Sequence, residues 1–357
     1  MAASFAEFDY KLPQESIAQT PLADRAASRM LVVDRARGSW EDRQFRDLPA
    51  FLGAGDCLVL NDSRVFPARL FGHRAGVHAL PVGKGNPARR EYLTGEVEVL
   101  LLGPVDAAAR EWEALVHPGK KMRVGERVRF ADGLEAEVIA RREFGERTLR
   151  FAAEGDLYER FEKLGHVPLP PYIKRADDAA DRERYQTVFA REKGSAAAPT
   201  AGLHFTPEVL DACRARGADI AFVTLHVGLG TFQPIHTERV AEHRLHSERY
   251  RIAADDAARM RAAQRLVAVG TTSVRTIESA MRSGGLRETA GETDLFIYPG
   301  FEFHATGAML TNFHLPRTSL LLLVCAFAGR DLTLAAYRHA VEYRYRFYSY
   351  GDCMLVV

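Results

Sequence analysis

A central run of short alternating segments constrains the fold of this chain most strongly. Between residues 69 and 152 the segments "EVEVLLL", "EWEALVH", "RVRF", "LEAEVIA" and "RTLRF" follow one another, separated by glycine-bearing turns. Most of them alternate polar and apolar residues, which is the period of a strand with one buried face. No long amphipathic helix interrupts the run. The pattern predicts a small antiparallel β-barrel.

The residues on either side of this run mix helix and strand signals. "TPEVLDACRARG" predicts a helix with Thr206 as N-cap, Pro207 at the first helical position and Gly217 beyond its end. "ADIAFVTLHV", "RLVAVG" and "CMLVV" predict strands, and "LLLLVCAFA" predicts a buried helix. "TTSVRTIESAMRSGG" predicts a helix with hydroxyl caps and a Gly-Gly stop, and "DLTLAAYRHAVEYRYR" predicts a helix capped by Asp331.

Together these signals predict an α/β (α+β) main domain with an inserted domain. We assign residues 1–68 and 153–357 to the main domain, and residues 69–152 to the small antiparallel β-barrel domain. A length of 357 residues agrees with two domains, and 47% hydrophobic residues suffice for a globular core. The stretch His73–Gly95, rich in Gly, Pro and Arg, is expected to form a solvated loop or an elongated hairpin.

Charge and cysteine use narrow the functional classes. A formal net charge of +1 excludes a strongly basic surface, so local patches would have to hold any RNA partner. The four cysteines are dispersed, with no CxxC pair, which favours a reducing cytoplasm. The opening "MAASFAEFDYKLP" lacks the pattern of a signal peptide, and "LLLLVCAFA" is far below the roughly 18 residues that cross a bilayer. We therefore expect a cytoplasmic protein without a membrane partner.

The segment "TLHVGLGTFQPIH" combines two glycines with two histidines. A dinucleotide-binding loop would need a third glycine where Gln233 stands, and no GxxxxGK[S/T] phosphate loop occurs in the chain. A turn at the end of a strand, in which Gly228 and Gly230 adopt positive φ, is the simplest interpretation.

Histidines crowd the second half of the chain and raise the question of a metal site. The seven considered are His204, His226, His236, His243, His246, His304 and His314. The chain has neither an H-E-x-x-H nor an H-x-H motif. His243 and His246 could share one helix face, but such a pair is more typical of a surface or a loop. We expect no metal, and a metal-dependent hydrolase built on these histidines stays an alternative.

Three polar segments lie where regular elements begin or end. They are "APTAGLHFT" with Thr200 and His204, "VGTTSVRTIES" with Thr271, Thr272 and Ser273, and "LTNFHLP" with Asn312 and His314. Helix N-termini offer unpaired N–H groups that suit a carboxylate or a phosphate. Simple capping would explain each segment alone, whereas the three together favour one pocket for a polar small molecule.

Two basic and aromatic stretches could contact RNA. "PPYIKR" places Tyr172 beside Lys174 and Arg175, and "YRYRFYSY" alternates rings with arginines. Stacking platforms with phosphate-binding cations have this composition. A helix face that buries rings and exposes arginines has it as well, so both interpretations stay open.

Taken in order, these segments resemble the S-adenosylmethionine:tRNA ribosyltransferase-isomerase family of queuosine biosynthesis. The resemblance covers nearly the whole chain, through the blocks "FDYKLPQESIAQTPLADRAASRMLVV", "LVLNDSRVFPARLFG", "PLPPYIKR", "YQTVFA", "GSAAAPTAGLHFT", "TLHVGLGTFQPI", "VGTTSVRTIES", "DLFIYPGF", "LTNFHLP" and "YRFYSYGDCML". It implies a large α/β domain interrupted by a small β-barrel. The His73–Gly95 stretch, Glu242 and Gly307 depart from the family's pattern.

The resemblance also implies a reaction. S-adenosylmethionine would be consumed as a ribosyl donor, and no metal or redox cofactor would be needed. The acceptor would be 7-aminomethyl-7-deazaguanine at the wobble position of tRNA, and the products would be epoxyqueuosine-tRNA, adenine and methionine. We expect a monomer. A non-catalytic tRNA-binding protein stays the second alternative.

Roles for individual residues follow from the same resemblance. The catalytic proton transfers are assigned to His204, His226 and His314, with the first two preferred. The residues expected to bind S-adenosylmethionine and its ribose are Thr200, Gly228, Gly230, Thr231, Thr271, Thr272, Ser273, Arg275, Glu278 and Asn312. Within this set, the hydroxyls of residues 271–273 and the Arg275 guanidinium would hold the methionine carboxylate. The expected tRNA contacts are Arg29, Arg64, Arg69, Tyr172, Lys174 and Arg175.

Overall fold

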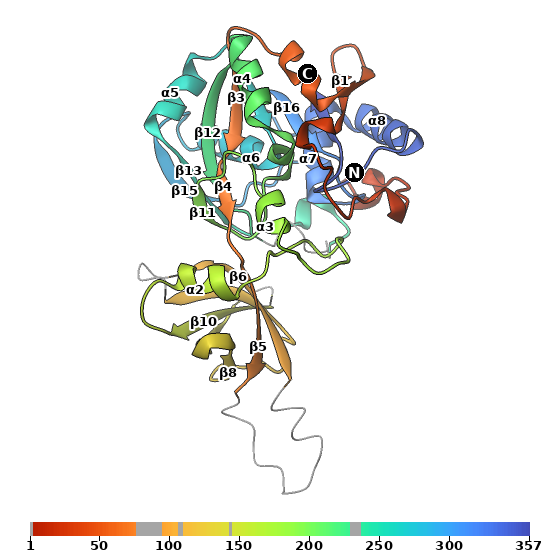
Figure 1. Ribbon diagram of the computed structural model, residues 1–357. Helices are drawn as coiled ribbons and strands as arrows, with labels where there is room; N and C mark the ends of the chain where they lie inside the picture. Colours follow the sequence, from red (N-terminus) through yellow and green to blue (C-terminus); the bar gives the residue numbers. More distant parts are fainter. Residues whose placement is uncertain (1–2, 76–94, 106–109, 143–144, 229–236) are drawn as a thin grey trace, which may run out of the picture.

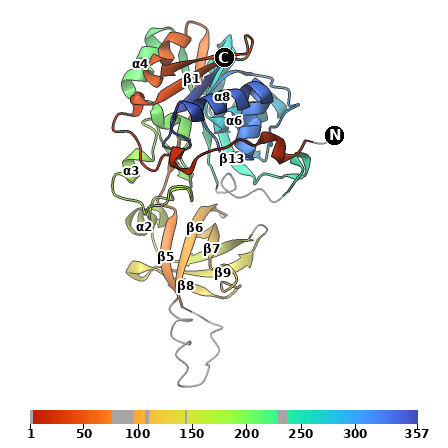
Figure 2. The ribbon, with the colours of Figure 1, turned by 90° about the vertical axis from the view of Figure 1, so that its right-hand side faces the viewer.

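A computed structural model describes residues 3–75, 95–105, 110–142, 145–228 and 237–357. They form a larger body built on a nine-stranded sheet and a smaller body built on a closed barrel (Figure 1). A view turned by 90° shows the barrel below the larger body again, with α2 between them (Figure 2). The fold class expected from the sequence is confirmed.

The smaller body is an antiparallel barrel. Within the described residues its strands are β5 (Arg69–Arg74), β6 (Glu96–Pro104), β7 (Glu111–His117), β8 (Arg127–Arg129), β9 (Glu135–Arg141) and β10 (Glu146–Ala152). They close in the order β10-β7-β6-β5-β8-β9, and every neighbouring pair is antiparallel. Alternate side chains point inward, and Trp112 on β7 is fully buried among them. The period-two pattern of the sequence therefore corresponds to the inside and outside of this barrel.

A helix outside the range assigned to the barrel packs on its core. This helix is α2 (Leu157–Leu164), which begins at the N-cap Asp156. Its buried Leu157 and Phe161 belong to the same apolar cluster as Trp112, and the Phe161 and Trp112 rings meet edge to face at 5.0 Å. The boundary placed after residue 152 thus separates α2 from the body that it packs against.

The larger body is a mixed sheet. Its strands run in the order β15 (Thr289–Thr293), β13 (Glu248–Ile252), β12 (Asp219–Leu225), β3 (Asp56–Asn61), β14 (Arg265–Val269), β16 (Thr306–Asn312), β17 (Cys353–Val356), β1 (Arg29–Asp34) and β2 (Ser39–Gln44). The central strands β12, β3, β14 and β16 are parallel, so their carboxyl ends lie at one edge. A separate parallel pair, β4 (Ser63–Val65) and β11 (Glu192–Ser195), follows that edge toward the barrel.

Apolar side chains cover both faces of this sheet, which explains why its central strands read as unbroken hydrophobic runs. On one face Val59 packs in a cluster with residues of α5 (Ala254–Ala262), α6 (Thr271–Arg282), α7 (Ser319–Ala328) and α8 (Arg330–Glu342). On the other face Leu58 and Leu60 pack with α4 (Pro207–Ala215) and the 3₁₀ helix η4 (Phe45–Phe51). The short helix α3 (Asp181–Arg184) lies near the barrel.

Local signals in the sequence located most of these elements. The helix α4 begins at Pro207 after the N-cap Thr206, whose hydroxyl accepts from Val209 N at 3.4 Å, and Gly217 beyond it has φ +89°. The predicted strands correspond to β12, β14 and β17, and "LLLLVCAFA" lies in the buried helix α7. All four cysteines are buried and unpaired.

Four local predictions were wrong. Gly228, expected in a turn with positive φ, does not have one. Helix α6 has Gly270 as its N-cap and no side-chain cap, because a glycine at φ +85° makes the turn from β14. Helix α8 begins after Gly329, so Asp331 lies in its first turn and does not cap it; the helix ends at Glu342, before "YRYR". His243 and His246 follow the 3₁₀ helix η9 (Val240–Glu242) in extended chain and share no helix face.

No single helix in the described part of the chain is long and apolar enough to cross a membrane. Helices α7 and α8 satisfy the length and composition criteria only as a pair, and they are bent by 115° at their junction.

Candidate functional site

A cavity of about 50 Å³ lies at the carboxyl edge of the parallel strands. Four segments far apart in the sequence form its wall: residues 198–201, residues 270–272 after β14, residues 311–314 at the end of β16, and residues 348–349. Tyr172, Val227 and Leu320 complete it. Ligands in open α/β sheets bind at this edge, because the loops that follow the strands gather there. The three polar segments of the sequence therefore do meet at one place.

The N-terminus of α6 forms one side of the cavity. Thr271 and Thr272 line it directly, as does Gly270 before them. The first N–H groups of a helix have no partner within the helix, and its dipole places partial positive charge there. Ser273 does not line the cavity: it is fully buried, and its hydroxyl donates to Val269 O at 2.8 Å. Thr200, on the opposite segment, does line it.

Asn312 brings an unpaired acceptor to the cavity wall. Its side chain is 2% exposed, and its Nδ2 donates to Tyr348 O at 3.0 Å and to His204 Nε2 at 3.3 Å. Its Oδ1 is buried and has no hydrogen-bond partner among the described residues. An orphaned acceptor of this kind is costly, so its presence points to a donor supplied by a ligand.

The three candidate histidines occupy different positions. His314 lines the cavity, with Nε2 2.8 Å from Thr311 Oγ1. His226 does not line it, although the next residue, Val227, does; the Nδ1 of His226 lies 3.0 Å from Ser63 Oγ. His204, at the end of the 3₁₀ helix η7 (Thr200–His204), lies behind Asn312 and does not line the cavity.

Burial keeps all three rings neutral near neutral pH. It lowers the pKa of His314 to about 3, and it lowers the pKa of His204 to about 3 with help from Arg25 and Arg346. The pKa of His226 falls to about 4, because of burial first and the charge of Arg249 second. A neutral imidazole can accept a proton, so these rings suit the role of base better than that of a standing acid.

A wider cleft opens beside the cavity. Its volume is about 450 Å³, within the range of about 300–1,000 Å³ typical of small-molecule sites. One wall is His226, Gly228 and strand β13, and the other is the barrel, with Glu113 and Glu146. Val227 lines the cavity and the next residue, Gly228, lines the cleft, so one segment of the chain borders both spaces.

Arg275 and Glu278 are engaged within the protein and are not available in the way that the sequence suggested. Arg275 is 5% exposed; it pairs with Glu248 and donates to Leu295 O at 3.0 Å and Thr293 O at 3.2 Å. The second oxygen of Glu248 accepts from Gly228 N at 2.9 Å. Glu278 is fully buried and accepts four hydrogen bonds from residues 304–306, which fixes the start of β16. Neither side chain is free to hold a carboxylate or a ribose.

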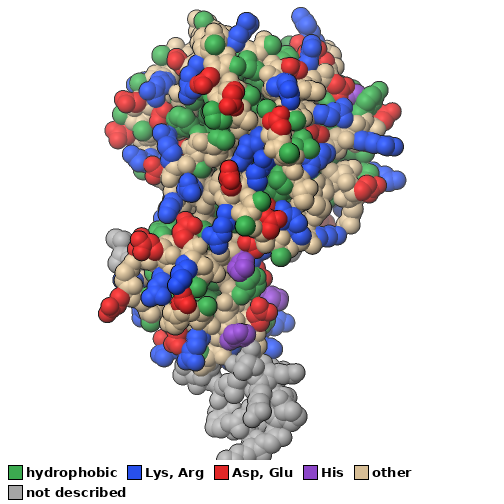
Figure 3. All heavy atoms as spheres, viewed as in Figure 1, with side chains coloured by type: hydrophobic (Ala, Val, Ile, Leu, Met, Phe, Trp, Pro, Cys, Tyr) green, Lys and Arg blue, Asp and Glu red, His purple; other side chains and the backbone are tan. Residues whose placement is uncertain are grey.

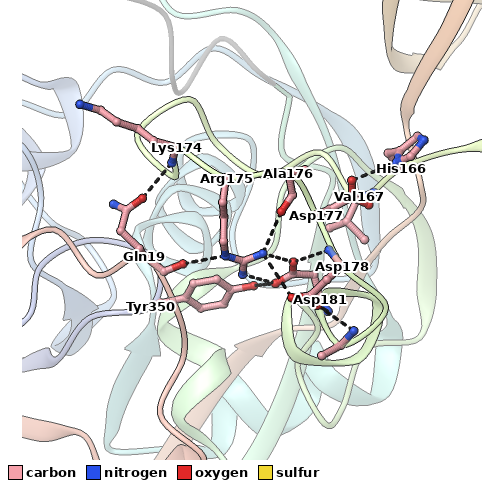
Figure 4. A network of polar contacts seen from close by, with 11 residues as sticks. Gln19, His166, Val167, Lys174, Arg175, Ala176, Asp177, Asp178, Asp181 and Tyr350 are labelled. Atoms are coloured by element: carbon pink, nitrogen blue, oxygen red, sulfur yellow. Dashed lines mark hydrogen bonds and ion pairs between the residues drawn. The ribbon is translucent and has the colours of Figure 1, made fainter.

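The expected tRNA contact at "PPYIKR" divides into an inward and an outward part. The Arg175 guanidinium donates to both oxygens of Asp181, at 2.6 and 2.7 Å, and Tyr350 donates to the same carboxylate at 2.8 Å (Figure 4). Tyr172 is turned into the cavity, where its ring meets that of Tyr348. Lys174 is exposed and extends away from this network.

The other expected tRNA contacts also divide into side chains held within the protein and side chains that are exposed. Arg29 donates to Tyr343 O at 2.7 Å and lies over the Tyr345 ring, and Arg69 pairs with Glu98 and donates to Leu169 O at 3.0 Å. Arg64 is exposed at the junction of the two bodies. Gly230, Thr231 and His236 lie outside the described residues. In the part of the chain that the structure describes, no group of three or more His, Cys, Asp or Glu side chains could hold a metal ion.

Several residues of the site were not singled out by sequence reasoning. Ser28 and Ser63 contact the candidate histidines, and Glu248 anchors Gly228. Glu248 carries a signal that could have revealed it, because it shares the buried face of β13 with Tyr250 and Ile252. A charged residue in the apolar phase of a strand indicates a buried partner. The two serines carry no comparable signal.

Comparisons with known proteins cover nearly the whole chain. The profile of the family described as "Queuosine biosynthesis protein" matches residues 5–356. A relative from Solibacter usitatus is 72% identical over 354 residues, covering 99% of this chain and 100% of that protein, and one from Symbiobacterium thermophilum is 51% identical over 357 residues, covering 98% and 99%. Both are named S-adenosylmethionine:tRNA ribosyltransferase-isomerase. A crystal structure of S-adenosylmethionine tRNA ribosyltransferase from Thermotoga maritima is 36% identical, with a TM-score of 0.54, and covers 98% of this chain and 100% of that one.

Proposed function

Because this chain belongs to the queuosine biosynthesis protein family, we propose that it is an S-adenosylmethionine:tRNA ribosyltransferase-isomerase. It transfers and isomerises the ribosyl moiety of S-adenosylmethionine onto 7-aminomethyl-7-deazaguanine at the wobble position of tRNA. The products are epoxyqueuosine-tRNA, adenine and methionine. S-adenosylmethionine is consumed as a substrate, no other cofactor takes part, and the protein works as a monomer in the cytoplasm.

The observation that supports this function best is the convergence of separate polar segments on one cavity. A helix N-terminus, an orphaned amide oxygen and a neutral histidine all lie on its wall, and one segment of the chain borders both it and the wider cleft. A substrate with a carboxylate, hydroxyl groups and an aromatic base needs such a mixed set of partners. The cavity takes one end of S-adenosylmethionine, and the cleft gives the acceptor base room to approach.

The reaction makes definite demands on these residues. The sulfonium acidifies the 5′ hydrogens of the ribose, and a base removes one of them. Adenine then leaves, the aminomethyl group attacks C1′, and a ribosyl oxygen closes the epoxide as methionine departs. His226 and His314 are the candidate histidines that line the cleft and the cavity, so we assign the proton transfers to them.

The carboxylate of methionine has one favourable place. The N-terminus of α6, with Thr271 and Thr272, provides N–H and hydroxyl donors together with the positive end of a helix dipole. Arg275 acts indirectly, since its pair with Glu248 holds the carboxylate that anchors Gly228. Thr200 lines the same cavity, and its hydroxyl serves the ribose.

The direct test mixes the purified protein with S-adenosylmethionine and tRNA carrying the 7-aminomethyl-7-deazaguanine base, without added metal and with a chelator. Adenine and methionine are followed by chromatography, and the tRNA is digested and analysed for epoxyqueuosine. Adenine and methionine released in step with the modified nucleoside support the proposal. No adenine release contradicts it, and turnover that the chelator abolishes favours the metal-dependent hydrolase instead.

A further inference from the structure

Behind the cavity, a chain of hydrogen bonds has only one consistent direction. Asn312 Nδ2 donates to Tyr348 O at 3.0 Å, and the same NH₂ group faces His204 Nε2, so the proton of the neutral ring belongs on Nδ1, which lies 2.9 Å from Ser28 Oγ. Ser28 Oγ accepts that proton and can donate in turn to Arg25 O at 3.4 Å. His204 Nε2 is then bare and accepts from Asn312 Nδ2 at 3.3 Å.

The opposite orientation of the Asn312 amide is unfavourable. Besides His204, two backbone oxygens face its Nδ2: Tyr348 O at 3.0 Å and Asp352 O at 3.5 Å. If the amide were turned over, Oδ1 would meet these two acceptors with no proton between them. All three neighbours are hydrogen-bond acceptors, so the NH₂ group must lie on their side. Oδ1 is left on the opposite side of the amide, buried and without a partner among the described residues, and Asn312 is one of the residues that line the cavity.

We propose that His204 is a positioning residue, which holds Asn312 so that Oδ1 is offered to the substrate only as a hydrogen-bond acceptor. The substrate group that Asn312 recognises must therefore carry an N–H or O–H, such as an amino group of a base or a ribose hydroxyl. His204 itself transfers no proton. This inference rests on the proposed function for the identity of the substrate, whereas the tautomer of His204 does not depend on it.

Two further features of His204 agree with this role. The ring is 3% exposed, and Asn312 separates it from the cavity. A second proton on the ring would direct an N–H at the Asn312 NH₂ group, where both partners would be donors. Burial opposes that proton as well, since it lowers the pKa of His204 to about 3.

The first experiment compares His204→Gln with His204→Phe. A glutamine can place its amide oxygen near the position of Nε2 and accept from Asn312, whereas phenylalanine fills the space without an acceptor. We expect His204→Gln to keep kcat/KM within about threefold of the wild type and His204→Phe to lose about tenfold or more, the loss expected for one misdirected buried hydrogen bond. The acidic limb of the pH–rate profile should be the same in His204→Gln and the wild type.

The opposite pattern identifies a catalytic base. If His204→Gln is as inactive as His204→Phe, or if its acidic limb disappears, the positioning role is wrong. Ser28→Ala is the milder variant for the case in which the ring substitutions do not fold, because it frees the His204 tautomer and leaves the ring in place. We expect it to lower kcat/KM severalfold, and unchanged kinetics would contradict the proposal.

A second experiment needs no substrate. Nitrogen-15 NMR of histidine-labelled protein reports which ring nitrogen carries the proton, and His204→Gln assigns the signal. We expect a neutral ring protonated at Nδ1 throughout the range from about pH 6 to pH 8. A proton at Nε2 overturns the inference even if the proposed function holds. If the expected tautomer is observed but the protein releases no adenine, the hydrogen-bond geometry is supported and only the proposed function is rejected.

Discussion

At the scale of single residues, three neutral histidines surround one site, but only two of them line the cavity or the cleft. His314 lines the cavity and His226 lines the cleft, whereas His204 bonds to Ser28 and Asn312 and borders only a separate pocket of about 20 Å³. Equal burial of a ring therefore does not mean equal function. Whether a histidine can reach a substrate depends on what lies next to the side of its ring that faces the site: a substrate-accessible space or another protein group.

Replacing His226 by alanine tests its role as a base. We expect His226→Ala to lower kcat by about 100-fold or more, the usual contribution of a general base. The KM for S-adenosylmethionine should change little, because the ring lines the cleft and not the cavity. His243→Ala is a suitable control: this ring packs between Phe5 and Phe296 and lines neither the cavity nor the cleft. Full turnover by His226→Ala would exclude the assigned role.

The buried histidines also predict how stability depends on pH. The folded-state pKa of His314 is about 3, below its ordinary value of 6.5, so the unfolded chain binds a proton more readily between these two values. Its contribution is complete above pH 6.5 and is lost as the pH falls, by about 1.4 kcal/mol for each pH unit between the two pKa values. We expect the Tm of His314→Gln to fall less steeply than that of the wild type between about pH 7 and pH 4.5.

The exposed His304 provides the control for this measurement. His304→Gln should follow the wild-type curve of Tm against pH, since an exposed ring is solvated in both states. Parallel curves for His314→Gln and the wild type would mean that His314 is protonated in the folded protein as readily as in the unfolded chain.

At the scale of elements, the site depends on where strands stop and helices start. The ends of β14 and β16 lie side by side because the strands are parallel neighbours, and this brings the first turn of α6 next to Asn312. Helix α2 is the element that joins the two bodies. It packs on the barrel core and ends where the chain returns to the larger body. Its last turn is held tightly there.

Gly165, at the end of α2, shows how tight this junction is. A Cβ on Gly165 would lie 2.0 Å from Pro67 O and 2.6 Å from Phe161 O, and both are backbone atoms that cannot turn aside. We expect Gly165→Ala to lower the free energy of unfolding by about 1–3 kcal/mol, as overpacking does. Gly53→Ala is the matched control, because a Cβ there meets no atom within 4 Å. Chemical denaturation of the two variants measures the difference. Equal stability would show that the junction accommodates the added methyl group with no loss of unfolding free energy.

At the scale of the whole molecule, contacts across the junction bring the barrel to the site. His246 Nδ1 lies 3.1 Å from Glu146 Oε1 of β10, and Lys193 Nζ lies 3.5 Å from Glu162 Oε1 of α2. These contacts place barrel residues along one wall of the cleft. Lys and Arg side chains alternate with Asp and Glu over the face in Figure 3, in agreement with the net charge of +1. A polyanionic substrate must therefore be held by a few cations.

This charge distribution predicts a modest salt dependence of tRNA binding. Each phosphate contact contributes about 0.7–0.9 to the slope of log K against log salt concentration. We expect Arg64→Gln and Lys174→Gln each to lower that slope by about one, because both side chains are exposed. Arg29→Gln should leave the slope unchanged, because its guanidinium is held by Tyr343 O and Asp42. Binding that is insensitive to salt would rule out contacts of this kind.

The sequence by itself determined the elements and the family. Alternation with a period of two located the barrel strands, and local capping residues located α4, because such signals act over a few neighbouring positions. The ordered blocks indicated the queuosine biosynthesis family, which the profile match and the two relatives confirm. The fold class followed from the same evidence.

Only the tertiary structure decided which polar side chains face the cavity. Arg275 is paired with Glu248, 27 positions away. His204, which the sequence assigned to proton transfer, has Ser28, 176 positions away, and Asn312 on either side of its ring. Tyr172, expected on the RNA surface, is turned inward against Tyr348. A buried polar group bonds to whichever partner the packing brings within about 3 Å. The local sequence does not contain that partner, so the sequence could name the polar residues of the site but could not orient them.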